Sequence, residues 1–547
     1  MKFVIFALIP LILSIGLIPA FPFSDAAEDN QICIDKVWIE NTKGKIACVT
    51  SSTADKLVER GWGTLLEISM EEPIEEELPL GIEKIETRSG TITIDHDYFT
   101  PESAKLLSDE LFFQRAVQVY HLALPAVGGA GIFNGVAELG AGYNDVIYWS
   151  DFMTSDFGLL TPNASVLYFM SMYNLSDGPI VVENPCCVMG AFNNIYQQTI
   201  ADVGTFGPFE GEAGAYLIIP PNYDEEIPEN YAVVQSDTMQ GYFIARSFVN
   251  DDDKSAARDL ILETRIYPLS ESENPPEQTF IDFSGKSAKL SHPTTEGYWE
   301  FLHNVYSNET IVREEDKNLI GLMHAIGIIP GEPFAPDDHS KEILDKAAIV
   351  ADLMARNIAY DSPVKENFIY YPDKHWELGF MTDNPDFEDN RGATQIEPRL
   401  SFAYQAITTS ESMVLNIEGS GSKYLMNYRD ADGNFLEGSN SYRLTVPANV
   451  PAENFWSVIA YDAETRSMIV NDQRPRSGFS SVHAEQYTQN PDGSYDVYFG
   501  QEAPEGFENN LINTNEGDGW FVIFRFYSPS AEYFDKSWEL PNIEKIE

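Results

Sequence analysis

The apolar residues follow two different spacings along the chain. From residue 165 to residue 270, short apolar runs such as "VLYFMSMY", "AYLIIP" and "GYFIARSFV" are separated by clusters of Gly, Pro, Asn and Asp. This spacing is typical of an antiparallel sandwich or barrel. Strand-like runs return from residue 400 onwards, where the Asp-Gly pairs of "DADGN" and "NPDGS" are hairpin signals. The pattern therefore predicts two β-rich regions.

Helical spacing occupies other stretches. "TPESAKLLSDELFFQRAVQVYHLALPAV" predicts a helix that begins at Thr100 and Pro101 and stops at Pro125, with His121 as a packing residue near its end. "TTEGYWEFLHNVY", "EEDKNLIGLMHAIGI" and "SKEILDKAAIVADLMARNIAY" have apolar residues three or four positions apart and predict a helical block over residues 286–365. The expected fold class is mainly β, with two β-sandwich or jelly-roll-like domains joined by helices.

A small hairpin-helix module is predicted at residues 28–70. Cys33 and Cys48 flank two strand-like runs that turn at "NTKGK", so a Cys33–Cys48 disulfide is expected across a hairpin. "TSSTADKLVERGWG" then predicts a short capped helix that ends at Gly61. The acidic, proline-broken segment at residues 71–90 is predicted to be a linker.

The first 26 residues predict a secretory signal peptide. Lys2 precedes an apolar stretch from Phe3 to Phe23, and Ser24 and Ala26 are the small residues of a cleavage site after Ala26. The stretch is also about long enough to span a bilayer, so an uncleaved N-terminal anchor stays open. Either alternative predicts a secreted or extracellular cell-surface protein.

The net charge of the chain limits the classes of partner that the protein is expected to bind. Lys and Arg number 34 and Asp and Glu number 86 among 547 residues, which gives a net charge of −52. Nucleic acid is therefore excluded, and so is a membrane partner beyond the N-terminal segment. A small organic ligand and a homo-oligomer are the partners left open. The adjacent Cys186 and Cys187 are expected to be two buried thiols, because neighbouring Cα atoms are too close for ordinary disulfide geometry, and a strained vicinal disulfide is the alternative.

Standard catalytic and metal-binding signatures are absent from the sequence. There is no G-x-S-x-G elbow and no H-E-x-x-H motif. Glu300 and His303 share a predicted helix face, but no second Glu-x-x-His pair accompanies them. The glycine-spaced "GTFGPFEGEAG" at residues 204–214 precedes a strand-like run and carries two glutamates, so we interpret it as a turn between strands and not as a phosphate loop. The sequence predicts no metal site and no cofactor, and it identifies no catalytic residue.

Several ordered motifs carry a family resemblance. "TPNASVLYFMSMYNLSDGPIVVENP", "QQTIADVGTFGPFEGEAGAYLIIPPNY" and "YAVVQSDTMQGYFIARSFV" resemble the domain of unknown function 1254, which we assign to residues 91–285. "RDADGNFLEGSNSYRLTVPANVPAENFWSVIAYDAETRSMIVND" and "GWFVIFRFYSPSAEYFDKSWELPNIE" resemble its habitual carboxy-terminal partner, the domain of unknown function 1214, at residues 366–547. The N-terminal module is similar to modules in secreted proteins of ammonia-oxidising archaea.

The resemblance implies two β-sandwich or jelly-roll domains joined by helices, commonly in secreted or envelope proteins. The family's chemistry is largely unassigned. Its first motif often reads Arg-Pro-Asn-x-Asp-Thr-Leu-Tyr, and this chain has Thr161 and Ser165 at the arginine and aspartate positions. If that charged pair carries activity in the family, the activity would be lost or changed here. If the pair only locks a loop, the fold would survive without it.

Two hypotheses about function follow. The first is a hydrolase-like enzyme or a binder of small organic molecules, whose cleft lies between the β domains and the helical block. Its candidate pocket residues come from the matched motifs, where Asn and Tyr would orient a carbonyl and Arg would pair a carboxylate. They are Asn163, Tyr168, Asn193, Asn194, Arg399 and Tyr404. The alternative is a non-catalytic structural protein of the cell envelope, which would expose a broad apolar surface.

Overall fold

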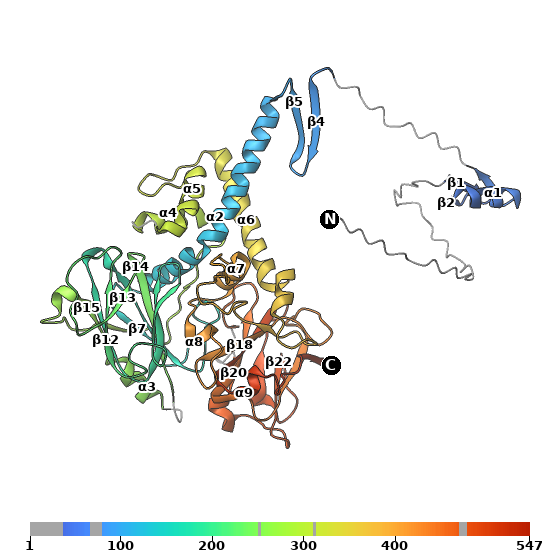
Figure 1. The fold of residues 1–547 in the computed structure, drawn as a ribbon. Helices are drawn as coiled ribbons and strands as arrows, with labels where there is room; N and C mark the ends of the chain where they lie inside the picture. Colours follow the sequence, from blue (N-terminus) through green and yellow to red (C-terminus); the bar gives the residue numbers. More distant parts are fainter. Residues whose placement is uncertain (1–36, 66–78, 250–252, 310–312, 470–477, 547) are drawn as a thin grey trace, which may run out of the picture. The chain divides into compact units, whose positions relative to one another are not determined.

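The computed structural model describes residues 37–65, 79–249, 253–309, 313–469 and 478–546 (Figure 1). The predicted signal peptide and Cys33 lie outside these residues. The chain divides into two compact units. One contains the residues up to Lys84 and Thr93–Tyr98, and the other contains Ile85–Ile92 and Phe99–Glu547.

The first unit contains the expected hairpin-helix module. β1 (Val37–Asn41) and β2 (Ile46–Val49) form an antiparallel hairpin, α1 (Ser51–Glu59) follows, and β3 (Gly63–Leu65) pairs with β1. The helix ends at Gly61, whose φ of 70° suits a residue without a Cβ. Cys48 is disulfide-bonded, and its expected partner lies outside the described residues.

A three-stranded sheet begins within the predicted linker. Its order is β4-β5-β6, with β4 at Ile82–Thr87, β5 at Gly90–Asp95 and β6 at Tyr98–Phe99. β4 therefore occupies part of the segment that the sequence assigns to the linker.

The first β domain of the larger unit packs two sheets face to face. A six-stranded sheet has the order β11-β10-β14-β8-β7-β16, and a four-stranded sheet has the order β13-β12-β9-β15. Their apolar inner faces form one core. The predicted turn at residues 204–214 joins β11 to β12, as expected. The strands are β7 (Val146–Tyr148), β8 (Leu167–Asn174), β9 (Ile180–Asn184), β10 (Val188–Asn194), β11 (Thr199–Val203), β12 (Gly214–Ile219), β13 (Ala232–Gln235), β14 (Gln240–Ser247), β15 (Arg265–Pro268) and β16 (Phe280–Asp282).

The second β domain is also built of two packed sheets. Their orders are β17-β18-β24-β20-β21 and β23-β22-β19-β25. The turn at residues 490–494 leads into β22 but joins no pair of hydrogen-bonded strands, so the hairpin predicted there is wrong. The strands are β17 (Glu377–Leu378), β18 (Ser422–Asn427), β19 (Ser441–Val446), β20 (Ala452–Asp462), β21 (Gly478–Ser480), β22 (Tyr495–Gly500), β23 (Leu511–Asn513), β24 (Trp520–Pro529) and β25 (Glu544–Ile546).

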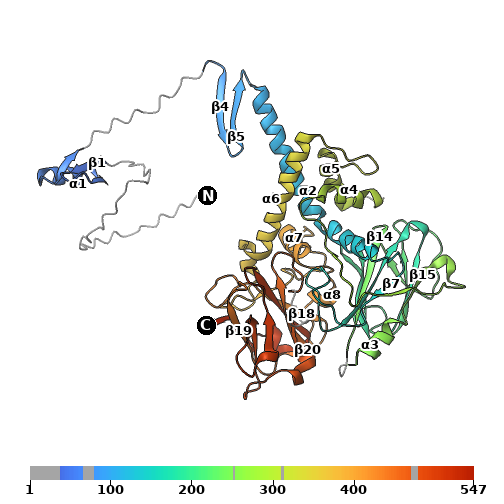
Figure 2. The ribbon, with the colours of Figure 1, turned by 180° about the vertical axis from the view of Figure 1, so that it is seen from behind.

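The helical block has its own core, in which α2 and α6 run side by side (Figures 1 and 2). Its helices are α2 (Pro101–Glu138), α4 (Tyr298–Asn308), α5 (Lys317–Ala325), α6 (Asp338–Tyr360) and α7 (Ile396–Gln405). Three shorter helices lie elsewhere in this unit, and they are α3 (Lys254–Ile261), α8 (Glu411–Val414) and α9 (Ala531–Phe534).

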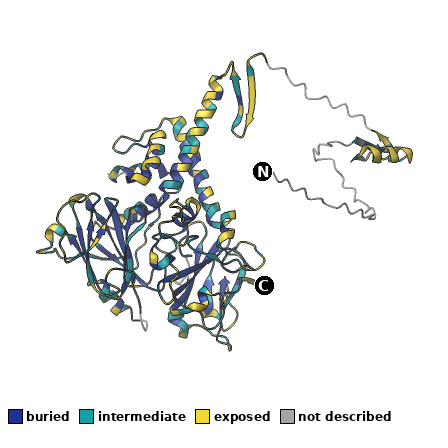
Figure 3. Ribbon diagram, viewed as in Figure 1, coloured by how far each residue is buried: buried dark blue, intermediate teal, exposed yellow. Residues whose placement is uncertain are grey.

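The predicted stop of α2 at Pro125 is wrong, because the helix continues to Glu138. Its start is confirmed, since the Thr100 side chain accepts a hydrogen bond from the Ser103 amide. Beyond Pro125 the helix is buried (Figure 3) and rich in glycine, and a Cβ at Gly129 would lie 2.4 Å from the Ile195 carbonyl oxygen. Close packing of the backbone therefore outweighs the cost of an internal proline.

Among the described residues, α2 is the one helix long and apolar enough to cross a membrane. Most of its apolar window is buried inside the protein, as expected of a core helix.

The two β domains share a further apolar core. It combines residues of β8 and β14 with residues of β18, β20 and β24, and Ile132 and Val136 of α2 also contribute to it. The sheets that face each other across this core are therefore covered on both faces, which explains why β14 and β18 are buried along their whole length. This shared core positions the candidate site.

The adjacent cysteines lie in the turn between β9 and β10. Both are free thiols, with their sulfur atoms 2.9 Å apart. The expectation that they are buried is wrong, because Cys186 is half-buried and Cys187 is exposed.

Candidate binding site

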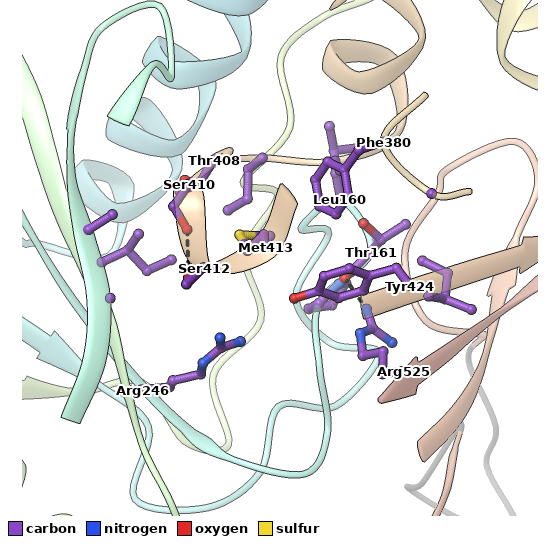
Figure 4. A pocket seen from close by; sticks show the side chains of 18 of the residues that line it. Leu160, Thr161, Arg246, Phe380, Thr408, Ser410, Ser412, Met413, Tyr424 and Arg525 are labelled. Carbon is purple, nitrogen blue, oxygen red and sulfur yellow. Dashed lines mark hydrogen bonds between the residues drawn. The ribbon is translucent and has the colours of Figure 1, made fainter. Parts of the chain in front are cut away.

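A cavity of about 110 Å³ lies between the two β domains (Figure 4). Its walls come from the loop before β8, from β10 and β14 of the first domain, from β18 and β24 of the second domain, and from the segment around α8. Most of the surface is apolar. The bulkiest apolar lining residues are Met189, Ile244, Phe380, Phe402, Met413, Met426 and Ile523.

One arginine enters the cavity from each domain. Successive side chains alternate across a strand, so Arg246 shares a face of β14 with Tyr242 and Ile244, and that face points toward the other domain. Arg525 likewise follows Phe521 and Ile523 on the shared-core face of β24. Each arginine therefore occupies a position where the strand pattern calls for an apolar residue.

Neither arginine has a carboxylate partner among the described residues. Arg525 is 4% exposed, its Nη2 donates to the Thr161 carbonyl oxygen at 2.9 Å, and its Nη1 has no hydrogen-bond partner. Arg246 is 9% exposed, and its Nη2 donates to the Met189 sulfur, a weak acceptor, at 3.2 Å. Two buried positive charges thus remain without a counter-charge, an arrangement that costs several kcal/mol per ion.

Tyrosines surround both guanidinium groups. Arg246 lies opposite Tyr168 in the β8–β14 register, and Arg525 lies opposite Tyr424 in the β18–β24 register. The Arg246 guanidinium carbon is 5.7 Å from the centre of the Tyr527 ring, and that of Arg525 is 5.8 Å from the centre of the Tyr424 ring. These distances allow cation–π attraction, which offsets part of the desolvation cost.

The tyrosine hydroxyls are available as hydrogen-bond donors. Burial raises the pKa of Tyr168 and of Tyr527, so both groups stay protonated. The Asn163 amide donates to the Tyr527 oxygen, which leaves the Tyr527 proton free to be donated. Figure 4 shows the Tyr424 hydroxyl and the Arg246 guanidinium pointing into the space between the domains.

Two threonines that line the cavity have a left-handed backbone. Thr161 has a φ of 41° and Thr408 has a φ of 59°, values that β-branched residues rarely adopt. Thr161 presents its carbonyl oxygen to Arg525, and the Thr408 and Tyr242 hydroxyls are 2.7 Å apart. Such strain is held by its surroundings and is concentrated at functional sites.

The remaining polar groups of the wall are hydroxyls. Ser410 and Ser412 place their oxygens 2.8 Å apart at the start of α8. No His, Asp, Glu, Lys or Cys is present among the described residues that line the cavity. The wall can therefore bind and orient a ligand, but among the described lining residues it holds no imidazole, carboxylate, lysine or thiol to act as a general base.

Of the six predicted pocket residues, Tyr168 lines this cavity. Asn163 is buried and contacts Tyr527, and its side-chain Oδ1 accepts a hydrogen bond from the Ser165 backbone amide at 2.9 Å. Asn193 and Asn194 are buried at the end of β10, where they hold nearby backbone and side-chain groups.

The other two predicted residues lie in α7. Arg399 borders a small cavity of about 20 Å³ beside Pro125 and Tyr196, and burial lowers its pKa. Tyr404 is buried, with its ring 4.2 Å from the guanidinium carbon of Arg466. The structure thus does not bring the six residues together in one pocket.

The sequence reasoning missed Arg246 and Arg525. Each is the single charged residue in a long apolar strand, within "GYFIARSFV" and "WFVIFRFYSP". A lone arginine in a strand buried on both faces is an available signal, since arginine is almost never fully buried without a partner. The departure at Thr161 also falls in the cavity wall, whereas Ser165 faces a separate, open hollow beside Cys187.

Family models match two parts of the chain that contribute residues to the site. The model described as "Protein of unknown function (DUF1254)" matches residues 143–268, and the model described as "Protein of unknown function (DUF1214)" matches residues 421–531. The two matches support the two-domain DUF1254 and DUF1214 family. The DUF1254 region supplies Arg246 and Tyr168, and the DUF1214 region supplies Arg525, Tyr424 and Tyr527.

Solved structures are similar to this chain at low identity. The VPA0106 protein from Vibrio parahaemolyticus is 17% identical, with a TM-score of 0.49, over 80% of this chain and 100% of that chain. An uncharacterized protein from Burkholderia cenocepacia is 11% identical, with a TM-score of 0.31, over 82% of this chain and 89% of that chain. A comparison with curated proteins gives no match. None of these comparisons assigns a function.

Proposed function

We propose that this protein binds a small organic molecule in the cavity between its DUF1254 and DUF1214 regions. The observation that carries the proposal is the cavity itself, an apolar space enclosed by both β domains and bordered by tyrosine and serine hydroxyls. Ligand sites in proteins typically combine a largely apolar wall with a few placed polar groups, and they occur preferentially at domain interfaces.

The volume of the cavity limits the size of the ligand. An engineered apolar cavity of about 150 Å³ binds benzene. The cavity here, at about 110 Å³, is somewhat smaller. We therefore expect a small molecule, with a short carbon chain or at most one ring.

The residues that line the cavity are better suited to binding a ligand than to hydrolysing it. An esterase or amidase needs a nucleophile and a base within hydrogen-bond reach of each other. Ser410 and Ser412 supply hydroxyls, but the described wall contains no base to activate them. We expect no turnover of an ester such as methyl benzoate.

We also propose that binding takes place outside the cytoplasm. Three features support this location, namely the N-terminal apolar segment, the disulfide-bonded Cys48 and the acidic composition. Mass analysis of the protein exported from its native host tests the location. A mass that corresponds to cleavage after Ala26 is expected, and a protein retained in the cytoplasm with its first residue intact would contradict it.

Ligand-observed NMR of the purified chain tests the binding function, with benzoate, benzamide and benzyl alcohol as probes. At least one probe should show saturation transfer, and Ala406→Phe, which fills the cavity, should abolish it. Ala431→Phe, in an exposed turn before β19, is the matched control and should leave the signal unchanged. Transfer to no probe, or equal transfer with Ala406→Phe, would refute binding in this cavity.

A further inference from the structure

We propose that the ligand is an organic carboxylate, whose anionic group is bound by Arg246 and Arg525. This inference rests on the proposed binding function and deepens it, since it names the chemical class of the ligand.

The charge balance of the chain leaves both arginines without a carboxylate partner among the described residues. The protein carries a net charge of −52, and acidic residues outnumber basic ones by 86 to 34. Carboxylates are abundant throughout the chain, yet none of the described ones pairs with either buried arginine. Two other buried cations do have such partners, since Arg313 is 2.5 Å from Asp316 and Lys365 pairs with Glu377, whereas the buried Lys423 and Arg466 donate to backbone carbonyl oxygens. Arg246 and Arg525 therefore lack a counter-charge that a bound anion would supply.

The two guanidinium groups have donors that a bound anion can use. The guanidinium of Arg525 has an unpartnered Nη1, and Arg246 gives Nη2 to a sulfur atom. A guanidinium group presents its donors in a planar fork that matches a carboxylate. The neighbouring hydroxyls of Tyr168, Tyr424 and Tyr527 can add donors to the same anion.

The apolar part of the cavity wall favours an organic carboxylate over an inorganic anion. Phe380, Phe402 and Met413 form an apolar wall that a phosphate or sulfate ion would leave without contacts. An organic acid satisfies both parts of the cavity, because its charged end meets the arginines and its carbon body fills the apolar space.

A purely structural role explains the arginines less well. A buried ion can often be replaced by a hydrophobic residue of similar size without loss of stability. Methionine at either position would join the surrounding apolar core of Ile244, Met426 and Ile523. The arginines are therefore costly for stability, whereas they supply the binding energy for an anion.

Titration calorimetry with a matched ligand pair tests the inference. Benzoate and benzamide have nearly the same shape, but only benzoate is charged. We expect benzoate to bind more tightly than benzamide. Arg246→Met and Arg525→Met should each weaken benzoate binding by about 10- to 100-fold and change benzamide binding little. Arg443→Met, which removes an arginine of β19 that pairs with Glu544 of β25, is the control and should change neither affinity.

The outcomes separate this inference from the proposed function. Equal affinity for benzoate and benzamide, or benzoate affinity unchanged in both methionine variants, would overturn the carboxylate assignment and leave the binding function standing. Competition by inorganic phosphate as effective as that by benzoate would also overturn it. Failure of every probe to bind would refute both proposals. If a methionine variant does not fold, Arg525→Lys keeps the charge without the planar fork and should weaken benzoate binding in the same direction.

Discussion

At the scale of single residues, the informative positions are polar side chains in apolar surroundings. Arg246 and Arg525 interrupt apolar strands, and Thr161 and Thr408 hold a backbone that β-branched residues avoid. Asp202 belongs to the same group, because it is buried on β11 with one carboxylate oxygen that has no hydrogen-bond partner. Each of these residues costs stability and needs a compensating contact or a role.

Asp202 should make stability depend on pH. Burial, together with the negative charge of Glu411, raises the pKa of Asp202 to about 6. A carboxyl whose folded pKa is raised favours the fold while it is protonated, and that contribution is lost as pH rises from about 4 through about 6. Asp202→Asn should therefore be more stable than the parent protein by about 2–3 kcal/mol at pH 7.5, and the gain should vanish near pH 4.

Urea denaturation at a series of pH values measures this difference. Asp492→Asn is the control, because the hydrogen bond from the Ser494 side chain lowers the pKa of Asp492 in an exposed turn. That variant should gain no stability as pH rises. A gain for Asp202→Asn that is independent of pH would argue against a raised pKa.

At the scale of elements, glycine has different structural roles in α2 and in α5. In α2, a Cβ added at Gly131 would lie 2.7 Å from the His292 amide nitrogen, because the helix packs directly on that segment. In α5, a Cβ at Gly321 meets nothing within 4 Å. The first glycine allows close packing, and the second is a helix interior position where alanine is preferred.

Alanine substitutions at Gly131 and Gly321 should change the free energy of unfolding in opposite directions. Gly131→Ala should lower the free energy of unfolding by about 1–3 kcal/mol through overpacking, whereas Gly321→Ala should raise it by about 0.5–1 kcal/mol. Chemical denaturation followed by tryptophan fluorescence measures both. A stabilising Gly131→Ala would show that α2 does not pack as closely as described.

At the scale of the whole molecule, the net charge of −52 means that acidic side chains repel one another within the folded protein, and this repulsion lowers its stability. Salt screens this repulsion, since the Debye length falls from about 30 Å at 0.01 M to about 3 Å at 1 M. We therefore expect the melting temperature to rise by several degrees between about 0.02 M and about 0.5 M NaCl. Scanning calorimetry measures the rise, which should be the same in KCl at equal ionic strength. A fall in melting temperature would mean that attractive ion pairs dominate the folded state.

The sequence by itself determined most of the strands and helices, although the strands predicted from residue 400 onwards begin only at Ser422, because α7 and α8 occupy Ile396–Gln405 and Glu411–Val414. Alternating apolar runs predict the strands of both β domains, and the spacing of three or four residues predicts α4, α5 and α6. The hairpin-helix module is predicted from its turn and its capping residues, and both observed sheet pairs agree with the expected sandwiches. These features are local, because hydrogen bonding and side-chain alternation act between near neighbours in the chain or along one strand.

The tertiary structure alone decided the length of α2 and the composition of the cavity. Pro125 reads locally as a stop, and it is overridden by close packing on segments that lie far away in the sequence. Arg246 and Arg525 are far apart in the sequence, because most of the two β domains lies between them. They line one cavity only because the two sheets that carry them pack face to face. Periodicity shows which face of a strand is buried, but it does not show what lies opposite. A site formed between distant strands is therefore set by their packing and not by either strand's own pattern.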